Sequence, residues 1–197
     1  MKKILSFIFC AVALLSTTSC LKDDYLYDYD NQKAVIEFMT ETKASTINCK
    51  NMKGVGAAYV NYSISDAKKI TEDIHVTVSL DESLIAGKAL LPAVAYKLRI
   101  HTMASDTYTS FPADAVIPAY AKLPDRRPNT DPSNPTENVQ LYEANRQSVA
   151  LVVEIDAEAA GIEVGTYYLP LRITSVSPNV APISGNFGYQ IITVNVQ

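Results

Sequence analysis

Two carboxylates and two histidines are the residues of this chain best suited to acid–base or metal chemistry. Glu154 and Asp156 lie two positions apart in an alternating segment, so they share one face of a predicted strand. Two acids about 5–10 Å apart can hydrolyse a glycosidic bond, but an exposed strand face is the commoner place for such a pair. His75 and His101 also lie at predicted solvent-facing positions, and they could share a metal only if their strands were neighbours.

The sequence contains none of the common catalytic or cofactor motifs. A glycine-rich phosphate loop, HExxH, GxSxG and CxxC are all absent. The oxygens of Asp125, Asn129, Asp131 and Asn134 could bind calcium, but they lack the spacing of a known calcium loop. We therefore predict that the chain is not an enzyme and that it holds no cofactor and no metal.

Cys20 has the clearest predicted covalent chemistry. Lys2 and Lys3 precede an apolar run at 4–15, which is too short for a stable membrane-spanning helix, and small residues at 16–19 lead to the cysteine. This arrangement resembles a bacterial lipobox, although Thr17 stands where leucine is usual. We predict a signal peptide over 1–19 and lipidation of Cys20. The alternative is an ordinary signal peptide in which Cys20 has no special role.

The residues after Cys20 indicate an address outside the cell. Lys22, Asp23 and Asp24 resemble the export tag of surface lipoproteins in Bacteroidota. The segment 20–33 is acidic and rich in tyrosine, which favours a hydrated tether. We therefore expect a protein that is anchored in the outer membrane by its lipid and exposed on the cell surface.

Composition excludes a nucleic-acid partner and a disulfide framework. Without Lys2 and Lys3, the count of 17 basic residues falls to 15 against 21 acidic ones, which gives a net charge of −6. Phosphate would repel such a chain. With Cys10 removed and Cys20 acylated, Cys49 has no partner, and we expect it to be a small buried apolar residue.

The region 34–197 is predicted to be one all-β domain. Apolar and polar residues alternate over 74–80, 96–101, 149–155, 167–176 and 192–196. The segments 35–39 and 55–65 also read as strands, the second because it is rich in small, aromatic and β-branched residues. About seven such strands and no long amphipathic helix favour an antiparallel β-sandwich of immunoglobulin type. Pro170 cannot donate to a strand ladder, so its strand is predicted to lie at a sheet edge or to carry a bulge there.

One long loop interrupts the alternating pattern. Residues 124–138 include four prolines and no aliphatic residue, so they cannot bury apolar area. The loop is either a solvated insertion or a ligand-binding loop. In the second case Arg126 and Arg127 would donate hydrogen bonds, and Tyr120 and Tyr142 would offer stacking surfaces.

The segment 165–176, with its Tyr-x-Leu-Pro-Leu strand, resembles the signature of a domain family of unknown function in Bacteroidota surface lipoproteins. The segment 111–115 resembles a second, weaker element of the same family. Such domains commonly lie N-terminal to glycosidase-like or lectin-like domains. The resemblance implies an immunoglobulin-like sandwich in a glycan-acquisition setting, and it transfers no catalytic residue.

These observations favour a non-enzymatic surface lipoprotein that binds a glycan or assists a glycan-uptake complex. The alternative is a structural or adhesive subunit, similar to a pilus anchor, that acts by strand addition. For that alternative the terminal strand 189–196 is the predicted donor or acceptor.

Overall fold

Two five-stranded β-sheets face each other in the computed structural model, which describes residues 34–39, 44–102, 105–123 and 147–197. Residues 33–197 form one compact unit. The first sheet has the order β1 (Ile36–Phe38), β3 (Lys53–Tyr62), β8 (Ser148–Asp156), β5 (Tyr96–His101) and β6 (Asp106–Thr109). The second has the order β2 (Ala44–Cys49), β10 (Tyr189–Val196), β9 (Gly165–Ser177), β4 (Ile74–Leu80) and β7 (Ala113–Ile117).

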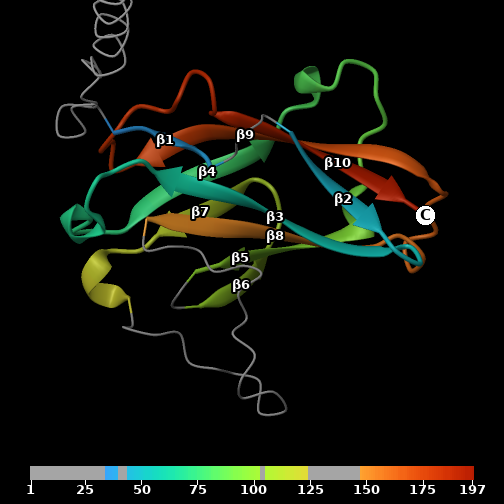
Figure 1. Cartoon of the computed structure of the whole chain (residues 1–197), viewed down its shortest axis with the longest axis horizontal. Helices are drawn as coiled ribbons and strands as arrows, with labels where there is room; N and C mark the ends of the chain where they lie inside the picture. Colours follow the sequence, from blue (N-terminus) through green and yellow to red (C-terminus); the bar gives the residue numbers. More distant parts are fainter. Residues whose placement is uncertain (1–33, 40–43, 103–104, 124–146) are drawn as a thin grey trace, which may run out of the picture. The chain divides into compact units, whose positions relative to one another are not determined.

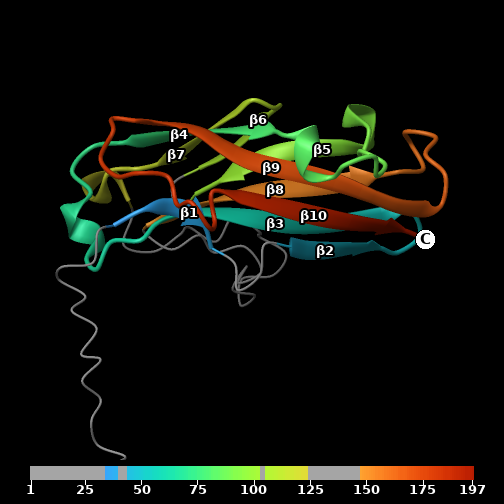
Figure 2. The ribbon, with the colours of Figure 1, turned by 90° about the horizontal axis from the view of Figure 1, so that it is seen from above.

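The strands pair antiparallel, except that β2 runs parallel to β10 (Figures 1 and 2). Among the described residues, four short 3₁₀ turns lie in the connections: η1 (Ala67–Lys69), η2 (Glu82–Leu84), η3 (Ala93–Ala95) and η4 (Tyr120–Lys122). No helix in the described ranges is long and apolar enough to cross a membrane.

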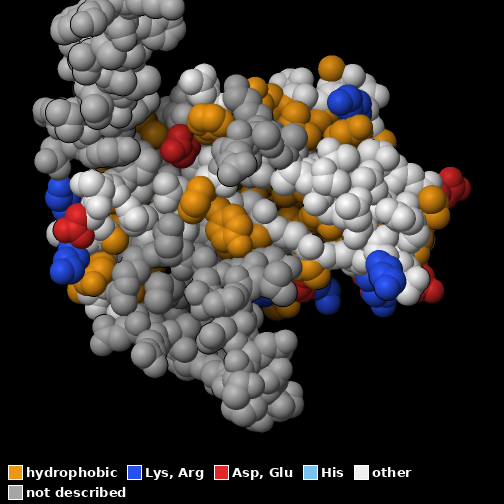
Figure 3. All heavy atoms as spheres, viewed as in Figure 1, with side chains coloured by type: hydrophobic (Ala, Val, Ile, Leu, Met, Phe, Trp, Pro, Cys, Tyr) orange, Lys and Arg blue, Asp and Glu red, His pale blue; other side chains and the backbone are white. Residues whose placement is uncertain are grey.

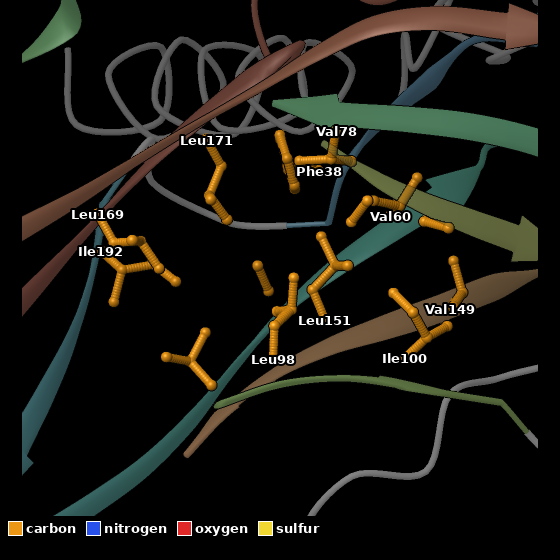
Figure 4. Close-up of a cluster of buried hydrophobic side chains, with 14 of the residues drawn as sticks. Phe38, Val60, Val78, Leu98, Ile100, Val149, Leu151, Leu169, Leu171 and Ile192 are labelled. Atoms are coloured by element: carbon orange, nitrogen blue, oxygen red, sulfur yellow. The ribbon is translucent and has the colours of Figure 1, made fainter. Parts of the chain in front are cut away.

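The core fills the space between the two sheets, because every second residue of each long strand points inward. Leu151 on β8 and Leu98 on β5 meet Leu169 and Leu171 on β9 and Ile192 on β10 in this layer (Figure 4). All five side chains are at most 1% exposed. Cys49 is buried in the same core, as predicted, and burial raises the pKa of its thiol.

The predicted all-β sandwich is confirmed, with ten strands in place of about seven. The alternating pattern predicted β4 and β5 with the observed bounds. It missed β2, β6 and β7 because their side chains carry little apolar signal. All four residues of β6 are exposed, and two of the inward residues of β7 are alanines, Ala113 and Ala115.

The prediction for Pro170 was wrong, because β9 lies in the middle of its sheet. The carbonyl of Pro170 accepts a hydrogen bond from the amide of Asp81, just beyond the end of β4. The amide hydrogen that proline lacks would point to the same side. The sheet tolerates Pro170 because β4 ends there, and the irregular pairing of β9 lies further along, opposite Thr77 and Val78.

The terminal strand β10 is not an edge. It pairs with β9 on one side and with β2 on the other over most of its length. The expectation that this strand is free for donation or acceptance is therefore corrected, since both of its backbone edges have neighbours. The Pro-rich loop 124–138 lies outside the described residues.

Candidate ligand-binding site

A cleft of about 590 Å³ opens where the chain leaves the first sheet for the second. We call it the β5–β6 cleft. A volume of this size lies within the ordinary range for small-ligand sites. Residues of β5, β6 and the segment that follows β6 form most of its wall, and Leu80 at the end of β4 closes it from the other sheet. The lining residues are Leu80, Ala93, Tyr96, Lys97, Leu98, Tyr108, Thr109, Ser110 and Phe111.

Two packed aromatic rings form the inner wall of the cleft. The ring centroids of Tyr96 and Phe111 are 6.3 Å apart and their planes make an angle of 56°. This is within the range of tilted aromatic pairs that attract each other. Burial raises the pKa of the Tyr96 phenol, so its hydroxyl stays uncharged to higher pH than that of an exposed tyrosine.

Tyr108 forms the outer wall and links the cleft to a polar network. Its side chain is 61% exposed, and its hydroxyl donates a hydrogen bond of 3.2 Å to Oε2 of Glu154. Tyr108 lies opposite Arg99 in the β5–β6 pairing, so both side chains stand on the face of the sheet that points away from the core. The ring is thus accessible to a ligand and held at its hydroxyl.

Arg99 is the centre of this network. Its Nε donates to Oε1 of Glu154 at 2.9 Å, and its Nη1 donates to Oδ1 of Asp106 at 3.1 Å. Burial opposes the guanidinium charge, but the two carboxylates together outweigh burial and raise the pKa of Arg99. One side chain therefore connects β5, β6 and β8 beside the cleft.

The cleft is suited to non-covalent binding. Its lining includes Tyr96, Tyr108 and Phe111, the hydroxyl-bearing residues Thr109 and Ser110, and Lys97. Tyr96 and Phe111 pack against the core, whereas Tyr108 borders the cleft from the outer face of the sheet. Sugar rings combine an apolar CH face with hydroxyl groups, and aromatic faces beside hydrogen-bonding groups match both features. Within the described ranges, no group of three or more potential metal-ligating side chains occurs.

The residues predicted from the loop composition do not form this site. Tyr120 lies in η4, half-buried, where its amide donates to the carbonyl of Ile70 at 2.8 Å, and it does not line the cleft. Arg126, Arg127 and Tyr142 lie outside the described residues, as do Cys20, Lys22, Asp23 and Asp24.

The predicted acid pair does share one face of β8, and both carboxylates are engaged. Glu154 accepts from Arg99 and Tyr108. Asp156 accepts from the amide of Ala159 at 3.0 Å and pairs with Lys53 at 3.2 Å, and these contacts lower its pKa.

The histidines belong to different sheets and do not form a pair. His75 is exposed, as predicted, and Nδ1 lies 2.8 Å from Oδ2 of Asp114. The prediction for His101 was wrong: it occupies the expected side of β5 but is 2% exposed, with Nδ1 2.5 Å from Oδ1 of Asp106.

Sequence reasoning missed Tyr96, Tyr108 and Phe111 as site residues. Tyr96 begins a strand that was predicted, and the register of that strand already placed Lys97 and Arg99 on its polar face. Tyr108 and Phe111 lie between the predicted strands 96–101 and 149–155, where no strand was predicted, so nothing in the pattern paired them with Tyr96.

The fold and the cleft define an all-β sandwich domain with an aromatic cleft at the end of one sheet. The model of a family described as "-like, N-terminal domain" matches residues 29–180, which is more than half of the chain. The chain therefore belongs to this family of N-terminal domains. This confirms the resemblance carried by the Tyr-x-Leu-Pro-Leu strand, which lies inside the matched region.

Solved structures with a similar arrangement come from Bacteroides. A two-domain protein of unknown function from Bacteroides fragilis NCTC 9343 has 10% identity and a TM-score of 0.49, over 84% of this chain and 46% of the other. A candidate carbohydrate-binding protein from Bacteroides ovatus ATCC 8483 has 11% identity and a TM-score of 0.42, over 82% of this chain and 37% of the other. The chain thus spans less than half the length of either protein. None of the curated proteins matches the sequence.

Proposed function

We propose that this chain is the non-catalytic, glycan-binding part of a lipoprotein displayed on the outer membrane, and that the glycan binds in the β5–β6 cleft. The observation that carries the proposal is the packed ring pair of Tyr96 and Phe111, which lines one opening of about 590 Å³ together with Tyr108. Aromatic rings provide a large apolar contact at a low cost in conformational entropy, and their partly exposed faces suit a sugar.

The charges around the cleft favour a neutral glycan. Lys97 is the cation in the lining, and it lies opposite Glu154 in the pairing of β5 with β8. The carboxylate of Asp156 is close enough to Lys97 for its pKa to be lowered by that amine. Because these two acids offset the charge of Lys97, an acidic sugar would gain little attraction here.

Two further features support the setting. The family consists of N-terminal domains, and the resemblance of the Tyr-x-Leu-Pro-Leu strand implies a glycan-acquisition system. The leader supports a lipid anchor and surface display. In it, Cys20 follows a short apolar run and is itself followed by Lys22, Asp23 and Asp24.

A binding panel tests the proposal. The purified protein is titrated calorimetrically with neutral and acidic polysaccharides, and then Tyr108→Ala is compared with Tyr168→Ala. Tyr168 is a suitable control because it stands outside the cleft, with Nζ of Lys88 4.7 Å from its ring centroid.

We expect a neutral polysaccharide to bind, Tyr108→Ala to weaken binding at least about tenfold, and Tyr168→Ala to leave it unchanged. The basis is that truncation of an aromatic residue that anchors a bound partner costs about 2 kcal/mol or more, and about 1.4 kcal/mol corresponds to tenfold. Equal effects of the two substitutions, or no binding across the panel, would contradict the proposal.

A further inference from the structure

The strand β2 is an edge strand of the second sheet and, among the described residues, pairs with another strand on one side only. It pairs in parallel with β10, from Ala44 opposite Ile191 to Cys49 opposite Val196. Figures 1 and 2 show it at the margin of the sheet, beside β10. The other long side of β2 is therefore the edge of that sheet.

The hydrogen bonds of β9 reveal which backbone groups of β2 face this edge. The amide of Tyr168 donates to Ala89 and its carbonyl accepts from Leu91, both at 2.9 Å and both away from β10. Tyr168 is paired with Thr193, so the backbone groups of Thr193 point the other way, to β2.

In a parallel ladder, Thr193 bonds to the residues on either side of its partner, which is Thr46. The backbone groups of Thr46 itself, and of Asn48 two positions on, consequently point outward. Within the part of the chain that the structure describes, these outward groups have no backbone partner.

The other sheet edges are protected in ways that β2 is not. The amides of Ile36 and Phe38 on β1 donate to the carbonyls of Pro182 and Phe187, at 3.0 and 2.8 Å. The edge strands β6 and β7 are shorter and each carries an acid, Asp106 and Asp114. Charges and cover of this kind normally prevent strand pairing between molecules.

β2 has the sequence Ala-Ser-Thr-Ile-Asn-Cys, without a charge or a proline. Figure 3 shows that the surface around β2 is largely uncharged, and that the charged side chains of this face lie mostly near its margins. An uncharged six-residue edge is a template for strand addition.

Close packing against β3 holds this edge in place. A Cβ on Gly56 would lie 2.5 Å from Cγ1 of Ile47, and a Cβ on Gly54 would lie 2.8 Å from Sγ of Cys49. The two glycines let the inward side chains of β2 sit directly on the β3 backbone. An incoming strand would therefore meet a pre-ordered edge, which lowers the entropic cost of binding.

The far end of the edge indicates the charge of the occupant. A hollow of about 370 Å³ is lined there by residues 48–51 and Gln197. Lys50 belongs to this lining, is exposed, and has no ion pair among the described residues. An acidic side chain of an added strand would satisfy this cation.

We propose that the β2 edge binds an extended segment of a partner protein, uncharged over about six residues and acidic at the end that meets Lys50. Pairing of two copies of this chain through the same edge is the less suitable arrangement. Six-residue edges alone fall short of the roughly 1,200 Å² that a stable dimer buries.

A peptide array tests this interface on the full chain. The probes are heptapeptides with alternating threonine and valine and a last position of aspartate, glutamate, glutamine or lysine. Their binding is measured by fluorescence anisotropy. We expect the acidic peptides to bind at least about tenfold more tightly than the lysine peptide, and Lys50→Glu to reverse this order. Lys53→Glu, which changes a lysine already paired with Asp156, should leave the order unchanged.

Two substitutions at one position separate the backbone from the side chain. Thr46→Pro removes the outward amide and should weaken peptide binding at least about tenfold, whereas Thr46→Val keeps that amide and should bind within about twofold of the unmodified chain. If Thr46→Pro does not fold, amide hydrogen exchange of the unmodified chain provides an independent measurement. Peptide binding should slow exchange of the amides of Thr46 and Asn48. Failure of every peptide to bind, unchanged exchange, or a concentration-dependent dimer that excludes the peptides would overturn the proposal.

Discussion

Two glycines on β3 set how closely the two sheets approach at one corner of the sandwich. Gly54 and Gly56 face Ile47 and Cys49 of β2, and no side chain larger than hydrogen fits between them. Neither glycine is required there for an unusual backbone angle. Steric contact alone accounts for both.

Gly56→Ala should therefore destabilise the fold by about 1–3 kcal/mol, because the new methyl group overlaps two carbons of Ile47. The measurement is the midpoint of urea unfolding. Gly185→Ala is the matched control, since a Cβ at Gly185 meets no atom within 4 Å. Equal midpoints for the two variants would show that β2 can move away from β3.

Asp73 is the residue from which we expect a pH-dependent contribution to stability. Its carboxylate accepts from Nζ of Lys122 at 2.7 Å and from the amide of Ala119 at 2.9 Å, and these bonds lower its pKa. A carboxyl whose pKa is lower in the folded state stabilises the fold above its unfolded pKa of about 3.9, and this contribution is lost as the pH falls below that value.

Asp73→Asn should cost about 1–2 kcal/mol at pH 7, as expected for the loss of hydrogen bonds to a charged group. At pH 2 the difference between the variant and the unmodified chain should shrink towards zero. Unfolding by urea at both values checks this, and a pH-independent difference would contradict it.

At the scale of elements, Arg99 connects three strands of the first sheet. It joins β5 to β8 through Glu154 and β5 to β6 through Asp106, and its side chain is 18% exposed. A double-mutant cycle of Arg99→Ala and Glu154→Ala should give a coupling free energy of about 0.5–3 kcal/mol.

The Lys53–Asp156 pair is the control for this cycle. It joins β3 to β8 at 3.2 Å, and its side chains are 60% and 45% exposed. Because exposed pairs are screened by solvent, its coupling should be smaller than that of Arg99 and Glu154. A larger coupling for this pair than for Arg99 and Glu154 would refute the ranking.

Strand prediction succeeded where large apolar residues mark a buried face, and it failed at three of the four sheet edges, β2, β6 and β7. β4 lies inside its sheet, and its inward residues Ile74, Val76 and Val78 alternate with outward polar ones. β6 is at an edge, where no packing requires an apolar residue, so its sequence carries no such pattern. The pairing of β2 with β10 joins segments from opposite ends of the domain, and local sequence gives no sign of it.

The cleft was not predictable for a related reason. Tyr96 and Phe111 are separated by a whole hairpin, and Leu80 comes from the other sheet. Alternation predicts the face on which a side chain lies, but not which strands become neighbours. The prediction of Tyr120 as a ligand contact rested on composition, and the structure places that residue away from the cleft.

At the scale of the whole molecule, the proposed lipid anchor and the sandwich have separate roles. Cys20→Ala should abolish labelling by radioactive palmitate and release the protein from the membrane fraction, while leaving the unfolding midpoint of the domain unchanged. Cys49→Ala is the control for labelling, since Cys49 is 1% exposed in the core. Retained label in Cys20→Ala would contradict the proposed lipidation.

The β5–β6 cleft and the β2 edge are formed by different strands. A glycan in the cleft and a peptide on the edge would therefore contact different strands, so either proposal can fail without the other. Glycan binding in the β5–β6 cleft is the function proposed for the domain.

An amide NMR titration of the purified protein with a neutral polysaccharide that binds it locates the glycan on the domain. We predict that the largest shifts occur in two segments, 96–101 and 106–111, and that they are absent from Tyr108→Ala at the same glycan concentration. Shifts confined to β2 and β10, or a pattern that Tyr108→Ala leaves intact, would contradict binding in the β5–β6 cleft.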